Sequence, residues 1–134
     1  LLICSILSED KIKEYISICD KLGLSALVEA HDESEVQMAL NAGARIIGVN
    51  NRNLGSFVTD VENSFRIARQ LREATHGPAS PLLVSESGIS DPETICRLRA
   101  AGFRGFLIGE TFMKTANPGE TLKKFIQDSL LINN

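Results

Sequence analysis

Polar side chains and glycines follow the apolar segments of this sequence at the points where strands are expected to end. In the run Ser85–Ile89, a carboxylate, a hydroxyl and a glycine come directly after the apolar segment Leu82–Val84. A second apolar segment, Phe106–Ile108, ends in Gly109-Glu110-Thr111. Backbone N–H groups exposed after such strands can cradle a phosphate, although each turn could also be a plain connection to a helix. Because the pattern occurs twice, we predict one anion site formed by Ser87, Gly88, Gly109 and Glu110.

Two other strand ends carry groups suited to acid–base chemistry and anion binding. Glu29 closes the apolar segment Ala26–Val28, where partial desolvation would tune its carboxylate for proton transfer. The alternative is a residue that caps or pairs near the next helix, but Glu86 at the equivalent point of another strand favours function. Asn50 and Arg52 offer an amide to orient a hydroxyl and a fork to hold a carboxylate or phosphate. Taken alone, Asn50 is also an ordinary turn residue.

The composition indicates one globular domain spanning residues 1–134. The chain has 134 residues, 43% of them hydrophobic and 23% charged, with a net charge of −3 and no linker or shift in composition. Nucleic acid and anionic membrane surfaces are disfavoured as partners, because both require clustered Lys and Arg. No segment approaches the roughly 20 apolar residues of a membrane helix. We therefore expect a cytoplasmic protein that binds a small molecule.

The cysteines and histidines do not form a metal-binding pattern. Cys4, Cys19 and Cys96 are odd in number and lack paired spacing, so we expect reduced core residues rather than disulfides or metal ligands. His31 and His76 lie far apart in the sequence and beside turn-forming residues. We interpret both as solvated loop histidines and predict no metal site.

Strand and helix patterns alternate along the whole chain. Strands are predicted at Leu1–Leu7, Leu24–Ala30, Arg45–Asn50, Leu82–Glu86 and Phe106–Ile108, the last ending at Gly109. The helices that follow have expected N-caps at Ser8, Asp32, Asp60, Asp91 and Asn117. A breaker-rich connection, Thr75–Pro81, precedes the fourth strand.

This alternation predicts an α/β fold with a parallel sheet and right-handed crossovers. The strands are nearly all apolar, which is typical of strands buried on both faces. Two architectures satisfy the pattern. One is a partial TIM (β/α)8 barrel of five parallel βα units, and the other is a flavodoxin-like open sheet. In both, ligands gather at the carboxyl ends of the strands.

Four segments together resemble indole-3-glycerol phosphate synthase of tryptophan biosynthesis. They are Leu27–His31, Ile47–Leu54, Val84–Ile89 and Leu107–Met113, in the family's order and at its spacing. The resemblance covers nearly the whole chain and implies strands four to eight of a (β/α)8 barrel. It also implies closure of the indole ring of a carboxyphenylamino-deoxyribulose phosphate, with loss of carbon dioxide and water and without a cofactor.

The resemblance assigns a role to each candidate residue. Glu29 matches the family's acid/base glutamate, Asn50 the residue that orients a substrate hydroxyl, and Glu86 a second active-site carboxylate. Arg52 matches an anion-binding residue, while Ser87, Gly88, Gly109 and Glu110 match the phosphate cradle. Another phosphate-handling barrel, phosphoribosylanthranilate isomerase, would share the cradle, but the set of Glu29, Asn50 and Arg52 disfavours it.

Departures from the family pattern lead to a further expectation. The family's lysines, including the general acid of ring closure, lie on strands that this chain lacks, and Asn53 stands where the family usually has aspartate. We therefore expect the chain to be inactive alone. The alternative is a non-catalytic half-barrel with a phosphate-binding or structural role. The exposed sheet edges and inner faces of a partial barrel would need to be covered. This could occur in a homodimer, which we favour, by pairing with a separate N-terminal half, or by collapse into a flavodoxin-like open sheet.

Overall fold

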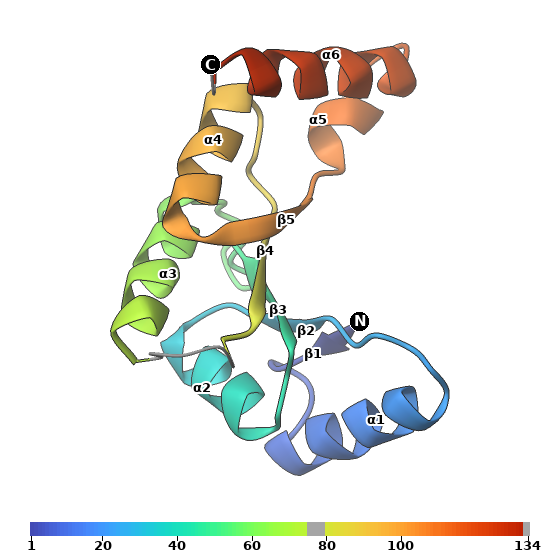
Figure 1. The fold of residues 1–134 in the computed structure, drawn as a ribbon, viewed down its shortest axis with the longest axis vertical. Coiled ribbons are helices and arrows are strands. Elements are labelled where there is room, and N and C mark those ends of the chain that lie inside the picture. Colours follow the sequence, from blue (N-terminus) through green and yellow to red (C-terminus); the bar gives the residue numbers. More distant parts are fainter. Residues whose placement is uncertain (75–79, 133–134) are drawn as a thin grey trace.

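The computed structural model describes residues 1–74 and 80–132 (Figure 1). Residues 75–79, in the predicted connection Thr75–Pro81, lie outside the described residues, as do residues 133–134, so the prediction for His76 is not addressed. The described elements are β1 (Leu2–Ile3), α1 (Glu9–Lys21), β2 (Val28–Ala30), α2 (Glu33–Asn41), β3 (Ile46–Asn50), α3 (Glu62–Ala74), β4 (Leu82–Glu86), α4 (Pro92–Ala101), β5 (Phe103–Leu107), α5 (Glu110–Met113) and α6 (Pro118–Leu131).

The strands form one sheet in sequence order. Each strand pairs in parallel with the next, giving the order β1-β2-β3-β4-β5. A flavodoxin-like sheet has the order 2-1-3-4-5, whereas successive strands of a (β/α) barrel are neighbours. The structure therefore confirms the partial barrel, and the flavodoxin-like alternative does not fit. The sheet is open, with β1 and β5 at its edges.

The main core lies between the sheet and the helices on one of its faces. Figure 1 shows α2, α3 and α4 along the same side of the central strands. Val28, Ile47 and Val49 are fully buried on that face, together with the helix residues Ile67 and Leu98. Side chains alternate between the two faces of a strand. The paired positions Glu29 and Gly48, and then Asn50 and Glu86, consequently fall on the opposite face.

The strands β1, β2 and β5 differ from the predicted ranges. The segment Leu1–Leu7 forms only the short β1, because the backbone N–H groups of Ile6 and Leu7 turn back to the carbonyl of Ile3. The predicted strand Leu24–Ala30 is reduced to Val28–Ala30, and β5 begins earlier than expected and ends at Leu107. Burial on both faces holds for β2 but not for the edges, where Leu107 is 48% exposed.

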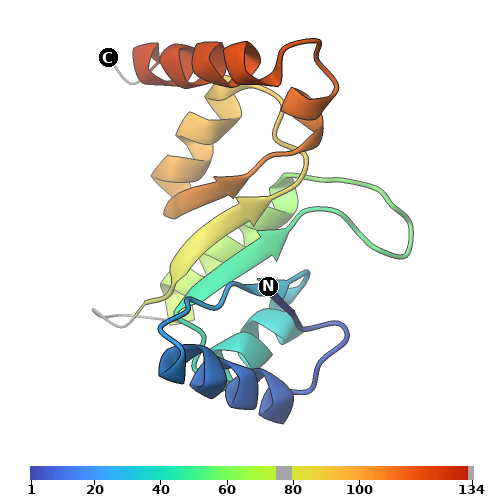
Figure 2. The same cartoon turned by 90° about the vertical axis from the view of Figure 1, so that its right-hand side faces the viewer.

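N-cap side chains define where most of the helices begin after the loops that precede them. The side chains of Ser8, Asp32, Asp91 and Asn117 each accept a hydrogen bond from the first turn of their helix, as predicted. Asp60 accepts from the backbone N–H of Glu62 at 3.0 Å, where α3 begins. Figure 2 shows β3 and β4 side by side, with the β3–α3 connection extending from their ends.

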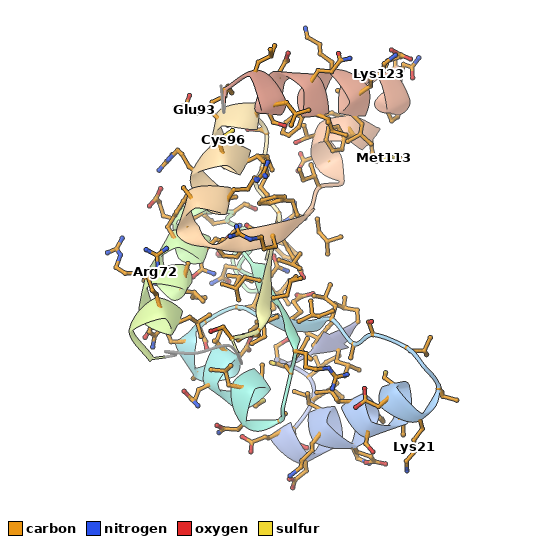
Figure 3. The ribbon with its side chains drawn as sticks, in the orientation of Figure 1. Lys21, Arg72, Glu93, Cys96, Met113 and Lys123 are labelled. Carbon is orange, nitrogen blue, oxygen red and sulfur yellow. The ribbon has the colours of Figure 1, made fainter. Side chains whose placement is uncertain are left out.

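Cysteine burial agrees with the predicted core role only in part. Cys4 is buried, whereas Cys19 and Cys96 are partly buried. Burial raises the pKa of the Cys4 thiol to about 11, which keeps it protonated and unreactive near neutral pH. Cys96, labelled in Figure 3, donates from α4 to the carbonyl of Ser129 in α6 at 3.4 Å. Within the described ranges, no helix is long and apolar enough to cross a membrane.

Candidate active site

All eight predicted site residues lie at the carboxyl edge of the sheet. Glu29 is in β2, while Asn50 and Glu86 are paired across the last positions of β3 and β4. Arg52 follows β3 by two residues. The four cradle residues follow β4 and β5: Ser87, Gly88, Gly109 and Glu110. Sequential parallel pairing is what brings these groups together, because it aligns the strand ends.

Hydrogen bonds connect Glu29, Asn50 and Arg52. The side-chain amide of Asn50 donates to Oε1 of Glu29 at 2.8 Å, and its carbonyl oxygen accepts the backbone N–H of Arg52 at 2.9 Å. Because its nitrogen donates to a carboxylate and its oxygen accepts from an N–H, the orientation of the Asn50 amide is defined. The Arg52 guanidinium lies 3.5 Å from the carboxylate of Glu110. One line of contacts thus runs from β2 to the turn after β5.

The Glu86 carboxylate occupies space that the absence of a side chain at Gly48 leaves free. A Cβ at position 48 would overlap Oε1 of Glu86 and lie 2.8 Å from its Cδ. Glu86 is only 5% exposed and Glu29 only 6%. Burial raises the pKa of Glu86 from 4.5 to about 7, and the nearby Glu29 carboxylate adds to the rise. The Glu86 carboxyl is therefore partly protonated near neutral pH.

His31 lies inside the site rather than in a solvated loop, so that prediction was wrong. Its Nδ1 is 3.0 Å from Oε2 of Glu35 and its Nε2 is 3.3 Å from Oε1 of Glu29, with the imidazole side chain 15% exposed. Glu35 also accepts the backbone N–H of His31 at 2.7 Å. The cause is local: Glu35, in the first turn of α2, folds back over His31, which precedes the N-cap Asp32. His31 is therefore a second polar neighbour of Glu29.

The predicted phosphate cradle lines a cavity of about 420 Å3. Ser87 and Gly88 have positive φ angles of 70° and 76°, and a Cβ at Gly88 would lie 2.5 Å from Cγ2 of Thr59. The hydroxyl of Thr111 donates to the carbonyl of Ile89 at 2.6 Å, which ties the two turns together. The residues lining the cavity are Arg52, Ser87–Ser90, Leu107–Thr111 and Lys114.

A second cavity, of about 490 Å3, opens on the other side of Arg52. Its walls come from the loops after β2 and β3 and from the start of α3: His31, Asp32, Asn50–Asn53, Ser56, Val58, Asp60, Asn63 and Arg66. Both volumes are in the range of small-molecule sites. Arg52 borders both cavities, so a single cation faces two adjoining compartments. The described residues contain no group of three His, Cys, Asp or Glu side chains arranged to hold a metal ion.

Comparison with known sequences identifies the family. The profile of the family described as "Indole-3-glycerol phosphate synthase" matches residues 1–125. A protein of that name from Bacteroides thetaiotaomicron is 55% identical over 127 residues, covering 95% of this chain and 46% of the relative. One from Lachnoclostridium phytofermentans is 52% identical over 117 residues, covering 87% of this chain and 41% of the relative.

The chain belongs to the indole-3-glycerol phosphate synthase family. It spans less than half the length of these curated relatives. Solved structures support the fold: mandelate oxidase with benzoyl-formic acid matches with a TM-score of 0.68 at 18% identity, over 92% of this chain and 38% of that one. FabK from Thermotoga maritima matches with a TM-score of 0.59 at 16% identity, over 78% of this chain and 32% of that one. The family resemblance and the barrel-like fold are both confirmed.

Sequence reasoning missed several residues of the site in this indole-3-glycerol phosphate synthase family member. Lys114 lines the cradle cavity from the end of α5, where no strand end marks it. His31 was set aside although it follows Glu29 by two residues and precedes Glu35 by four. Gly48 is an unremarkable strand glycine in the sequence, and only the tertiary structure places the Glu86 carboxylate over it.

The raised pKa of Glu86 predicts a pH-dependent loss of stability. Below pH 4.5 the carboxyl is protonated in both the folded and the unfolded chain. Between about pH 4.5 and 7 the unfolded chain releases this proton first, so stability falls as the pH rises. The neutral variant Glu86→Gln should therefore be more stable than the parent chain at about pH 8, by up to about 3 kcal/mol, and similar to it at about pH 4.

Denaturant unfolding of both chains at the two pH values measures this difference. Glu33→Gln, an exposed carboxyl in α2, serves as the control and should show no comparable gain. If the Glu86→Gln variant and the parent chain are equally stable at both pH values, then burial does not keep Glu86 protonated in the folded chain.

Gly48→Ala should displace the Glu86 carboxylate. The overlapping atom is the far end of a flexible side chain, so we expect Glu86 to swing out towards water and its pKa to fall towards 4.5. The pH-dependent loss of stability should then largely disappear. The same unfolding measurement tests this, with Gly119→Ala as control, because its added Cβ meets nothing closer than 3.8 Å. A Gly48→Ala chain with the full parental pH dependence would rule out the displacement.

Proposed function

We propose that this chain supplies the acid–base carboxylates and the phosphate site of an indole-3-glycerol phosphate synthase. The reaction is closure of the indole ring of a carboxyphenylamino-deoxyribulose phosphate, with loss of carbon dioxide and water. The observation that carries the proposal is the close grouping of buried Glu29 and Glu86 with partly buried Asn50, next to the residues that line the cradle cavity, within a chain of this family. The class of enzyme is a carboxy-lyase of tryptophan biosynthesis, working without a cofactor.

Each group has a task that its surroundings support. Glu29 exchanges a proton with the substrate, oriented by the amide of Asn50 at 2.8 Å. Glu86, with its pKa raised to about 7, is partly protonated near neutral pH and is suited to donate or share a proton. Asn50 also orients a substrate hydroxyl. These three residues act on the reacting part of the substrate.

Anion binding falls to the second group of residues. We assign the substrate phosphate to the cavity lined by Ser87, Gly88, Gly109 and Glu110, and Arg52 to an anionic group of the substrate. Lys114 lines the same cavity and adds a positive charge suited to a phosphate. The nearby Glu110 carboxylate pairs with Arg52 and is 76% exposed, so it can move aside at little cost.

We further propose that the chain does not catalyse turnover alone. By family resemblance, the general-acid lysine belongs to strands outside the five described, and loss of a general acid typically costs about 10² to 10⁴ in rate. The chain's coverage of less than half of its relatives' length supports this view. Lys114, at the end of α5, is assigned here to the phosphate and not to ring closure.

The sheet edges support the need for a partner. Within the part of the chain that the structure describes, β1 and β5 each pair with one strand only. Leu82 in the inner strand β4 is 45% exposed, and Leu107 in the edge strand β5 is 48% exposed. Unpaired strand edges and exposed apolar side chains favour association with another chain. For the chain by itself we propose a homodimer. A polypeptide carrying the remaining strands would compete for the same edges and complete the barrel.

A ring-closure assay by indole fluorescence tests the proposal. The purified chain is measured alone and mixed with a polypeptide that supplies the missing strands and lysines. We expect turnover only in the mixture, and a loss of about 10² to 10⁴ in rate when the mixture contains Glu29→Gln. The control variant is Glu93→Gln, an exposed carboxyl of α4 labelled in Figure 3, which should leave turnover unchanged.

Two results would overturn parts of this proposal. Turnover by the chain alone, near that of the mixture, would refute its incompleteness. Silence in the mixture, with both polypeptides folded by circular dichroism, would favour the alternative of a non-catalytic half-barrel that binds phosphate or serves a structural role.

A further inference from the structure

Asn51, directly after β3, is a buried residue with no role in the reaction proposed above. It is 3% exposed, and its side-chain amide uses its full hydrogen-bonding capacity. Its Oδ1 accepts from the backbone N–H of Ser64 at 3.1 Å and from the Ser64 hydroxyl at 2.8 Å. Its Nδ2 donates to the hydroxyl of Ser85 at 3.1 Å and to the carbonyl of Ser87 at 3.1 Å.

Two of these contacts and a third, between the hydroxyls of Ser64 and Ser85, close into a ring with a defined direction. The Ser64 hydroxyl donates to Asn51, so the 2.8 Å contact between the hydroxyls of Ser64 and Ser85 requires Ser85 to be the donor there. The Ser85 oxygen in turn accepts from Nδ2 of Asn51. Ser64 and Ser85 are fully buried, and a satisfied buried network of this kind holds its members in a single arrangement.

The backbone of Asn51 adds two further contacts. Its N–H donates to the carbonyl of Glu86 at 2.8 Å, and its carbonyl accepts the N–H of Asp60 at 2.9 Å. Asn51 therefore holds two successive carbonyl groups, those of Glu86 and Ser87, at the point where the chain leaves β4. It also ties that point to the loop before α3.

The direction of the Ser87 carbonyl also sets the direction of the Gly88 N–H, because both groups belong to the same peptide unit. In a planar trans peptide, the carbonyl of Ser87 and the N–H of Gly88 point in opposite directions. Asn51 draws this carbonyl towards the buried ring, while the N–H of Ser87 donates to the carbonyl of Leu107 at 3.3 Å. The Gly88 N–H is thereby directed away from the ring, and Gly88 lines the cradle cavity.

The turn needs such support, because Ser87 adopts a left-handed conformation with φ of 70°. This conformation is unfavourable for a residue with a Cβ, and it persists where neighbouring contacts impose it. The hydrogen bond from Asn51 to the Ser87 carbonyl is one of the contacts that impose it.

We propose that Asn51 is a positioning residue for anion binding, which sets the direction of the Gly88 N–H in the cradle. Asn51 is also bonded directly to Arg52, so it fixes the backbone from which this cation, which lines both cavities, extends. The inference rests on the proposed function in one respect, namely that the cradle holds the phosphate of a substrate.

Titration of the chain with inorganic phosphate, followed by amide NMR shifts, tests the inference. Asn51→Asp keeps the shape and the acceptor but replaces the donor to Ser87 with an oxygen. We expect phosphate binding to weaken at least about tenfold, the equivalent of one net hydrogen bond, and the Gly88 amide resonance to move. Asn53→Asp is the matched control: it adds the same charge two residues away, and its Oδ1 contacts with Gly55 and Ser56 can remain. It should weaken binding less than about threefold.

A second variant keeps the test decisive if Asn51→Asp does not fold. Ser64→Ala breaks the ring while leaving Asn51 in place, and we expect an intermediate loss of phosphate affinity, about threefold or more. Phosphate affinity unchanged in a folded Asn51→Asp or Ser64→Ala chain, whatever the loss of thermal stability, would show a purely structural role and overturn the inference. Absence of phosphate binding by the parent chain would instead overturn the proposed cradle, and the inference with it.

Discussion

The register between β3 and β4 is the constraint on which the site depends. Five consecutive pairs, from Ile46 opposite Leu82 to Asn50 opposite Glu86, hold these strands in parallel. Side chains alternate between faces, so a slip of one residue would turn Glu86 into the helix-packed core and bring Ser85 to the site. The buried hydroxyl of Ser85 and the buried carboxylate of Glu86 each suit only the face that they occupy.

This constraint also explains how the fold tolerates a costly group. A buried carboxyl destabilises the folded chain in its charged form, and Glu86 lies beside a second carboxylate. The opposite face of the same strands carries Ile47, Val49 and Leu83 into the core under the helices. The free energy gained by apolar burial on one face thus offsets the cost of burying carboxyl groups on the other. The site and the core lie on opposite faces of the same strands.

The order of the elements and the position of the candidate residues at the strand ends could be predicted from the sequence because both depend on local signals. Apolar runs, cap residues and the polar group after each strand are contiguous in the sequence. What escaped prediction depends on side-chain geometry and on distance along the chain. His31 meets Glu29 and Glu35 only because Glu35 folds back over it, and Asn51 meets Ser64 and Ser85 across 13 and 34 positions. β1 and β2 are shorter than the predicted strands and β5 begins earlier than predicted, because an apolar run does not reveal which of its residues have a neighbouring strand to pair with.

The contact between Arg52 and Glu110 gives the cradle a resident counter-ion. Both side chains line the same cavity, 3.5 Å apart, and both are well exposed. Under the proposed function, an anion that binds Arg52 would therefore exchange places with the Glu110 carboxylate. Exposed pairs of this kind contribute at most about 1 kcal/mol, so under the proposed function a doubly charged phosphate would displace the carboxylate at little cost. A singly charged ion would gain less from Arg52, and the pair would therefore favour the dianion.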